Sequence, residues 1–261
     1  MERLNDRRVV EHSGITANGI RKWGMFLLAA SVVGRSIIQC RIFGIGSVTG
    51  EELLAIMEKD QKMMYLAAIS VILQACEACA AAIYAFLMTE GVLKTSDIKA
   101  YVLRVAGVAI LSEIPYNLAF SGKWIDFSSR NPAFGLLIGL VMLWFYKAFP
   151  GFKGTNLLYK IAATVGACLW CSLLDISHGI CIVVIALTLW AFQKKPQFRV
   201  YAGAMAAILC SIISPFYMIA PVAFLLLHSY NGEKGESNTT LNYLSYPVML
   251  IVVTLIGVIV F

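Results

Sequence analysis

The segment 99–120 reads KAYVLRVAGVAILSEIPYNLAF, and it combines the length of a membrane span with residues that lipid does not accommodate. A helix needs about 20 apolar residues to cross a bilayer. Glu113 and Asn117 are one helical turn apart, and Pro115 between them removes a backbone hydrogen bond. Polar, irregular backbone is tolerated at membrane depth only where it is buried in protein or lines a wet cavity. We therefore expect this helix to break or bend, and its Glu113/Asn117 face to line a cavity that opens outward.

The composition of the chain indicates a membrane protein. Of 261 residues, 59% are hydrophobic and 14% are charged, too few charges to cover a soluble protein of this size. The fold class we expect is all-α, a polytopic transmembrane helix bundle of about eight or nine spans in one domain, residues 1–261. The predicted spans are 24–46, 63–89, 99–120, 132–149, 155–174, 178–193, 198–213, 214–228 and 242–261. The runs 198–213 and 214–228 are short, and a re-entrant pair or one broken element is also compatible with them.

The distribution of basic residues predicts the orientation. With the N-terminal segment 1–23 in the cytoplasm, the loops on the inner side carry most of the Lys and Arg residues, as the positive-inside rule requires. This pattern predicts a multi-pass protein of the cytoplasmic (inner) membrane, surrounded by the lipid bilayer, and not a nucleic-acid-binding protein. Segment 47–62 is expected to form an amphipathic helix on the outer face. Segment 229–241 is expected to be a cytoplasmic loop.

Ionisable residues inside apolar runs are candidates for function, because a charge in lipid is costly. Arg35 and Glu77 lie near the middle of their spans and are expected to pair, either as a structural link or as part of a substrate site. Arg104 either extends its charge to the membrane surface or binds a ligand. Asp175 and His178 occur in the sequence LLDISHGI, either as parts of a wet turn or as a base with its carboxylate.

Two cysteine pairs have CxxC spacing, Cys76 with Cys79 and Cys168 with Cys171. In a soluble protein this spacing would indicate a zinc site or a redox centre. Inside apolar runs, cysteines three residues apart share a helix face and pack as small hydrophobic residues. Helix packing is therefore expected here, and neither a metal site nor a bound cofactor.

The segment YAFLMTEGVLKTSDIKAYVLRVAGVAILSEIPYNLAFSGK, residues 84–123, resembles the central signature of the TraX family. These are bacterial integral membrane proteins named for a pilin acetylation factor. The family pattern has F-x-F-L-x-x-E-G, then K-x-Y-x-x-R, then S-E-I-P-[FY]-[DN]-L-A. The residues that match in order and spacing are Phe86, Glu90, Gly91, Lys99, Tyr101, Arg104, Ser112, Glu113, Pro115, Asn117, Leu118 and Ala119. The NPAF, LLDISHGI and YNGEKG segments also resemble family motifs.

The resemblance implies membrane-embedded acyl transfer, with acetyl-CoA as a co-substrate. The acceptor would be a peptide, sugar or lipid that carries an amine or a hydroxyl. On this interpretation the catalytic base is Glu113, or His178 with Asp175. The residues expected to bind substrate or donor are Arg35, Glu77, Arg104, Asn117, Glu90, Asn131, Tyr230 and Asn231.

The chain departs from the family pattern at residues suited to proton transfer. Members commonly carry an Asp-His pair in the first span, where this chain has Gly34 and Arg35. The family arginine upstream of F-x-F-L falls at about Ala78, and the histidine of the C-terminal Y-P-x-H-L motif is Met249. One alternative is therefore a catalytically degenerate protein that keeps the fold for binding, immunity or assembly. A second is a small ion-coupled transporter, so the enzyme assignment stays open at this point.

Overall fold

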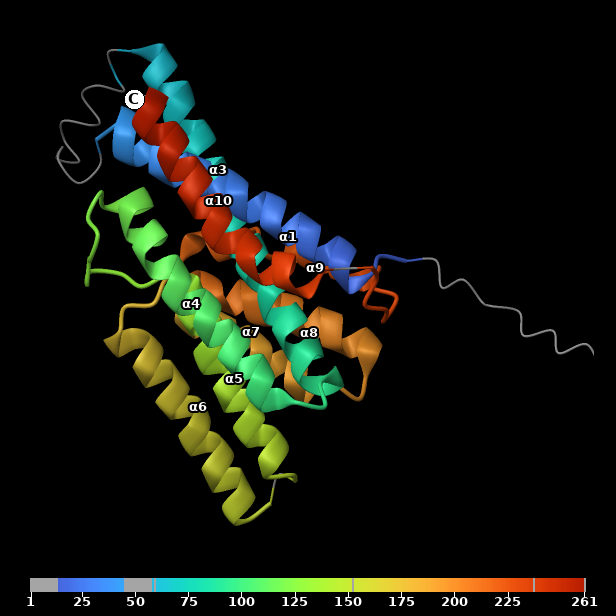
Figure 1. The fold of residues 1–261 in the computed structure, drawn as a ribbon. Helices are drawn as coiled ribbons and strands as arrows, with labels where there is room; N and C mark the ends of the chain where they lie inside the picture. Colours follow the sequence, from blue (N-terminus) through green and yellow to red (C-terminus); the bar gives the residue numbers. More distant parts are fainter. Residues whose placement is uncertain (1–13, 45–57, 59, 152, 237, 261) are drawn as a thin grey trace, which may run out of the picture.

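The computed structural model describes residues 14–44, 58, 60–151, 153–236 and 238–260, whose arrangement Figure 1 shows. Apart from two isolated bridges, all regular structure in these ranges is helical, which confirms the all-α class. The α-helices are α1 (Ala17–Val32), α3 (Gln61–Lys94), α4 (Ile98–Phe120), α5 (Pro132–Ala148), α6 (Thr155–Leu173), α7 (Gly179–Ala191), α8 (Pro196–Leu209), α9 (Pro221–His228) and α10 (Thr239–Val260). A π-helix, η1 (Val33–Ile42), continues α1, and two 3-10 turns, η2 (Cys210–Ile212) and η3 (Pro215–Met218), follow α8.

Within the described residues, four helical segments are long and apolar enough to cross a membrane, namely Ala17–Ile42, Gln61–Lys94, Thr155–Leu173 and Thr239–Ile259. The other helices are shorter or less apolar, so the number of eight or nine spans stays a prediction. The first span begins at Ala17 rather than at residue 24, because the Thr16 side chain caps the helix by accepting from the Gly19 N–H. The predicted segment 47–62 lies mostly outside the described residues, as do residues 1–13 of the N-terminal segment.

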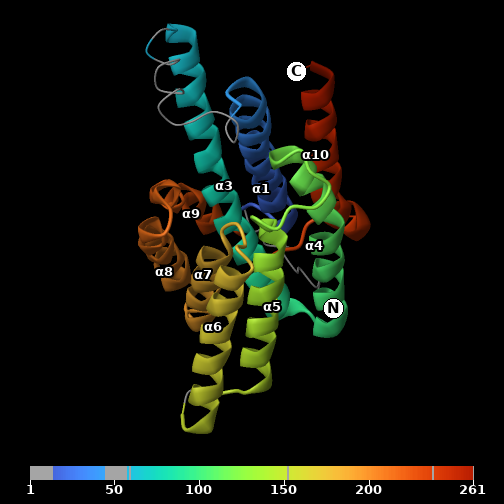
Figure 2. The same cartoon turned by 90° about the vertical axis from the view of Figure 1, so that its left-hand side faces the viewer.

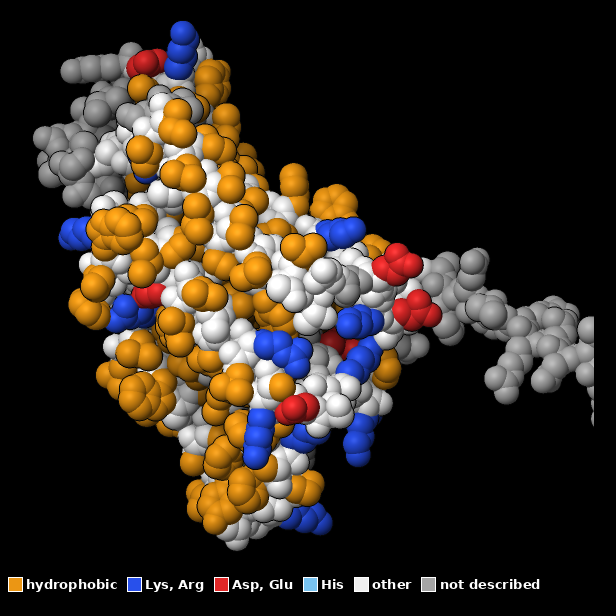
Figure 3. All heavy atoms as spheres, in the orientation of Figure 1, with side chains coloured by type: hydrophobic (Ala, Val, Ile, Leu, Met, Phe, Trp, Pro, Cys, Tyr) orange, Lys and Arg blue, Asp and Glu red, His pale blue; other side chains and the backbone are white. Residues whose placement is uncertain are grey.

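The surface of the bundle is apolar over most of its area. Large side chains such as Ile72, Leu103 and Leu173 are exposed, and Figure 3 shows hydrophobic side chains along the length of the visible face. On that face Lys and Arg side chains gather towards one end, near the start of α1. A soluble protein rarely exposes such continuous apolar surface. Together with the four long apolar helices, this distribution identifies a membrane protein.

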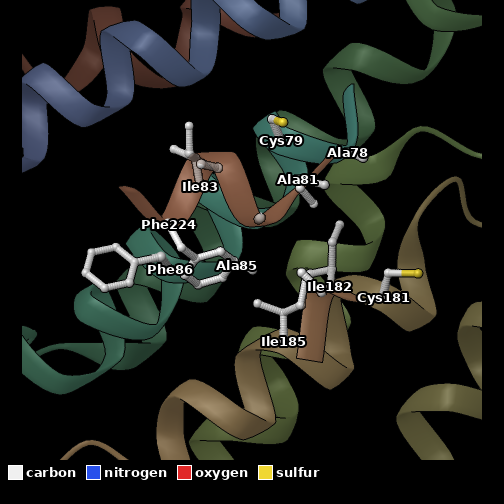
Figure 4. Close-up of a cluster of buried hydrophobic side chains, with 14 of the residues drawn as sticks. Ala78, Cys79, Ala81, Ile83, Ala85, Phe86, Cys181, Ile182, Ile185 and Phe224 are labelled. Carbon is white, nitrogen blue, oxygen red and sulfur yellow. The ribbon is translucent and has the colours of Figure 1, made fainter. Parts of the chain in front are cut away.

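Helix α3 is the central element, and small residues allow its neighbours to approach closely. It contacts α1, α5, α7 and α9. Alanines on α3, among them Ala78, Ala81 and Ala85, are buried against Ile182, Ile185 of α7 and Phe224 of α9, as Figure 4 shows. Small residues at helix interfaces are the usual means of close packing in membranes, where lipid supplies no hydrophobic drive between helices. Figure 2 shows that α5 and α6 extend together beyond the rest of the bundle at one end.

Helices α8 and α9 form a hairpin. With 14 and 8 residues, they are about 21 and 12 Å long, shorter than the apolar thickness of a bilayer of about 30 Å. They pack side by side, and the ring of Tyr201 near the start of α8 lies 6.1 Å from that of His228 at the end of α9. The chain therefore reverses between them, which agrees with the re-entrant pair considered for this region.

The connections between helices form two clusters. Near the start of α1, Lys94 Nζ donates to the Gly232 carbonyl at 2.6 Å, and Asn18 Nδ2 donates to the Glu236 carbonyl at 2.6 Å. In the other cluster, the Ser177 N–H donates to the Arg130 carbonyl at 3.0 Å, which joins the α4–α5 and α6–α7 connections. The second cluster fixes the position of Ser177, the residue before His178.

Candidate functional site

A cavity of about 490 Å³ runs through the bundle between α1, α3, α4, α5 and α10. Along α3 it extends from Glu77 to Lys94, which corresponds to about 25 Å. We call the end at Lys94 the mouth and the end at Glu77 the inner end. The volume lies within the range of about 300–1,000 Å³ that is typical of ligand pockets. The length favours an elongated ligand.

The mouth is basic. Cationic side chains from four separate segments line it, namely Arg21 of α1, Lys94 of α3, Arg104 of α4 and Lys234 before α10. The Nη1 atom of Arg21 is buried and has no hydrogen-bond partner among the described residues. A guanidinium with a free N–H beside further cations is suited to a phosphate or a carboxylate. The mouth can therefore hold an anionic ligand.

Glu90 is the acidic residue that lines the mouth, and its charge is already balanced. Its carboxylate forms salt bridges with Arg199 of α8 and, at 2.9 Å, with Lys94. Tyr230 also donates to it at 3.3 Å. Glu90 and Tyr230 were both expected to bind a ligand, and both line the cavity. Their mutual contacts show that they also hold α3, α8 and the 229–236 segment together.

The inner end carries a carboxylate–imidazole pair. Glu77 is buried on α3, and its Oε1 lies 3.4 Å from Nε2 of His178. The second imidazole nitrogen, Nδ1, lies 3.0 Å from the hydroxyl oxygen of Tyr217 in η3. Glu77 and His178 both line the cavity, and Tyr217 lies behind them, fully buried. The expected partner of His178 was Asp175, but Asp175 is exposed and lies outside the cavity lining, so that pairing is wrong.

A strained turn positions His178. Asp175 and His178 both have positive φ values, 47° and 58°, which non-glycine residues rarely adopt. The turn is held against α5 and α6 by glycine contacts. A Cβ on Gly179 would lie 2.9 Å from Cys171 Cβ, and a Cβ on Gly135 would lie 2.9 Å from Gly179 Cα. The close approach of these segments therefore fixes where the imidazole enters the cavity.

The environment of His178 favours its protonated form. The residue lies in the connection between α6 and α7, outside the helices. Burial by itself lowers the pKa of the imidazole, but the carboxylate of Glu77 raises it by more, so the pKa of His178 lies above its ordinary value. An imidazole beside a carboxylate can both accept and donate a proton. The pair is therefore suited to acid–base chemistry.

Arg35 does not form the expected salt bridge with Glu77. Within the described residues, Glu77 pairs with His178, and Arg35 Nη1 donates to the Tyr116 hydroxyl at 3.5 Å. The guanidinium also lies over the Phe120 ring, 4.5 Å from its centroid. The π-helical turns of η1 bring Arg35 to Tyr116 of α4. Arg35 and Glu77 therefore form no salt bridge with each other, although they were predicted to lie at similar depth in the bilayer.

Glu113 does not line the cavity between α1, α3, α4, α5 and α10. Its carboxylate accepts from Arg130 Nη1 at 2.8 Å and from Asn131 Nδ2 at 2.6 Å, and it is not among the residues that line the cavity. Asn117, on the same helix, is buried and also lies outside the lining. This cavity is therefore not the outward one predicted at Glu113 and Asn117. The chain after α4 folds back over Glu113 and satisfies it.

Helix α4 also continues without a break through Pro115. Asn131 donates to the carbonyl of Ala109 at 2.9 Å and at the same time to Glu113, so it links the helix to the following segment. The predicted break is therefore wrong, and the bend that was its alternative stays a prediction. Asn131, expected at a binding site, has a structural contact instead, and Asn231 forms a turn by accepting from the Glu233 N–H at 3.0 Å.

Several residues of the site were not predicted from the sequence. Arg21, Met25 and Leu28 line the cavity from one face of α1, and their helical spacing could have indicated that face. Arg21 was instead assigned to the cytoplasmic segment. Tyr217 comes from the break between α8 and α9, where nothing local indicates that its hydroxyl meets His178.

The fold and the cavity define a class, a multi-helix membrane protein with a basic mouth and an acid–base pair inside. The chain matches the family model described as TraX protein over residues 53–257. This match covers most of the chain, and the protein belongs to the TraX family. No curated protein and no solved structure matches the chain.

Proposed function

We propose that this protein transfers an acyl group, acetyl in the first instance, from a coenzyme A thioester to an amine or hydroxyl acceptor at the membrane. The observation that carries the proposal is the arrangement of one elongated cavity with cations at its mouth and the Glu77–His178 pair at its inner end. A long donor with anionic groups at one end and a reactive carbonyl at the other matches this arrangement.

The donor would lie along α3. Its phosphate groups would contact Arg21, Arg104 and Lys234, and its thin pantetheine arm would follow the apolar wall formed by residues such as Leu87 and Val105. Guanidinium groups form paired hydrogen bonds with phosphate, and Arg21 has an unpartnered N–H for this purpose. The thioester carbonyl would then reach the inner end.

The Glu77–His178 pair would act as the base. In the tautomer whose Nδ1–H faces the Tyr217 hydroxyl, Nε2 would take up the proton beside Oε1 of Glu77, 3.4 Å away, and that carboxylate would stabilise the imidazolium that forms. The acceptor nitrogen or oxygen attacks the thioester carbonyl as Nε2 removes its proton. The C–S bond breaks, and the coenzyme A thiolate leaves and takes up that proton.

This pair also answers the main objection from the sequence. The Asp-His pair common in the family's first span is absent here, which favoured a degenerate binding protein or a transporter. Glu77 and His178 form a carboxylate–histidine pair from other segments of the chain. The enzyme therefore remains the better-supported function.

The proposed orientation places the mouth in the cytoplasm of a cell with this protein in its inner membrane. Arg21, Lys94, Arg104 and Lys234 all lie at that end, as the positive-inside rule requires. The N-terminus would then be cytoplasmic, and cytoplasmic acetyl-CoA would reach the mouth directly.

Binding of radiolabelled acetyl-CoA to the detergent-purified protein tests the proposal. We expect saturable binding and slow hydrolysis, and we expect the double substitution Arg21→Gln/Arg104→Gln to weaken binding by about 10-fold or more, because hydrogen bonds to charged groups are worth about 1.5–3 kcal/mol. Lys123→Gln is the matched control, since Lys123 is an exposed cation outside the cavity. Absence of binding in the folded wild-type protein would show that the fold serves another function.

A further inference from the structure

Arg35 lies beyond the inner end of the cavity. It is about 20 Å further along the α1–η1 axis than Arg21 at the mouth, and it is not part of the cavity lining. Its hydrogen-bond partner Tyr116 lies 3.0 Å, oxygen to oxygen, from Ser177, the residue before His178. A line of polar groups therefore leads to His178 from the side opposite the mouth. The proposed donor does not need this approach.

The guanidinium of Arg35 is poorly satisfied. It has five N–H donors, and its hydrogen bond among the described residues is the 3.5 Å contact with Tyr116. No carboxylate of the described residues lies within salt-bridge distance of it. By contrast, Arg41 on the same π-helix donates to the Gly257 carbonyl at 2.9 Å, and Arg130 pairs with Glu113.

The helix that carries Tyr116 also has an unused hydroxyl group one turn away. Ser112 lies one turn before Tyr116 on α4, is fully buried and has no hydrogen-bond partner among the described residues. The π-helix that carries Arg35 is itself informative, because π-helical turns occur frequently at functional sites. A cation at membrane depth that forms no salt bridge with a carboxylate of the described residues indicates a site for an anion.

We propose that Arg35, with Tyr116 and Ser177, binds an anionic group of the acceptor, a carboxylate or a phosphate. This inference rests on the proposed acyl transfer and names the class of its acceptor, a molecule with an oxyacid group close to its amine or hydroxyl. The guanidinium forms paired hydrogen bonds with such a group, and the hydroxyls of Tyr116 and Ser177 add donors. The nucleophile is then held at Nε2 of His178. The anion occurs both in small soluble molecules and in lipid headgroups.

Matched acceptors test this site. Transfer from labelled acetyl-CoA would be measured to O-phosphoethanolamine against ethanolamine, to glycine against glycinamide, and to phosphatidylethanolamine in nanodiscs. We expect the wild-type protein to prefer the anionic member of at least one pair by about 10- to 100-fold. Preference for the nanodisc lipid over the soluble phosphate would identify a headgroup as the source of the anion.

The substitution Arg35→Gln should abolish the preference and leave the acetyl-CoA affinity unchanged, and Arg35→Lys should retain part of it. Arg41→Gln is the matched control and should keep the full preference. Thermal stabilisation by the same anions without acetyl-CoA gives a second readout, present in the wild-type and Arg41→Gln proteins and lost in Arg35→Gln.

Two results overturn the inference. One is equal transfer within both pairs, or no transfer to any probe, by a wild-type protein that binds and hydrolyses acetyl-CoA. The other is an anion effect that survives Arg35→Gln. Failure of the wild-type protein to bind acetyl-CoA would instead contradict the proposed acyl transfer. Thermal stabilisation by the anions would then show whether the anion site exists independently of that function.

Discussion

Two carboxylates on consecutive helices, the buried Glu77 of α3 and the partly buried Glu113 of α4, meet different environments. Glu113 is held by Arg130 and by Asn131, two permanent donors close in sequence, and lies outside the cavity. Glu77 is held by His178, a group that gains and loses a proton, and lines the cavity. An acidic residue at membrane depth is therefore not enough to indicate a catalytic role. The partner of the carboxylate distinguishes the two residues, because the guanidinium of Arg130 does not exchange its protons near neutral pH, whereas the imidazole of His178 can gain or lose one.

The largest expected effect comes from His178→Gln, which removes the proposed base and keeps a side chain of similar reach. We expect kcat for acyl transfer to fall by about 10²- to 10⁴-fold, with the affinity for acetyl-CoA close to that of the wild type. Steady-state transfer and equilibrium binding would be measured on the same preparation. His228→Gln is the control, since His228 is exposed and outside the cavity. A fully active His178→Gln protein would place the chemistry elsewhere.

A smaller loss of activity, together with a change in its pH dependence, is expected for Glu77→Gln. The carboxylate raises the pKa of His178, so its removal lowers that pKa. The base must be neutral to act, so activity is lost as the pH falls through the pKa of His178. The ordinary pKa of histidine is about 6.5, so in the wild type the acid limb of the kcat/KM profile should lie above this pH. In Glu77→Gln the acid limb should move to lower pH. An unmoved limb would show that Glu77 does not act through His178.

The smallest effect on activity is expected for Glu113→Gln. This substitution leaves Arg130 without its partner charge, so the free energy of unfolding should fall by about 1–3 kcal/mol while kcat/KM stays near the wild-type value. Thermal or denaturant unfolding in detergent measures the first quantity and steady-state transfer the second. Glu58→Gln, a substitution at an exposed residue before α3, should leave both unchanged. Loss of transfer without loss of stability would restore Glu113 as a catalytic candidate.

Much of the fold follows from local pattern. The apolar runs predicted the helical segments closely, including α5, α6 and α10, because helix formation in lipid satisfies the backbone within each segment. The short runs around Ser214 were interpreted as uncertain, and the structure places a hairpin there. The boundaries that differed most are at the first span and α3, where contacts at the mouth extend the helices beyond their apolar cores.

The site was predicted less well, for a physical reason. His178 was named as a candidate base, but with Asp175, its neighbour in sequence. Glu77 was named with Arg35, a residue at similar depth. Neither pairing forms, because partner choice depends on how the helices rotate and approach, and small residues such as Ala78 and Gly179 set that approach.

The sequence by itself therefore determined the class of the protein, a helical membrane bundle with basic residues at one end. The hydropathy and charge of a segment depend only on its own residues, so they can be read from the sequence one segment at a time. Only the tertiary structure decided that Glu77, His178 and Tyr217 meet, that Glu113 pairs with Arg130, and that Arg35 contacts Tyr116 rather than forming a salt bridge with Glu77. These contacts join residues far apart in the chain, and they depend on close packing that no single segment encodes.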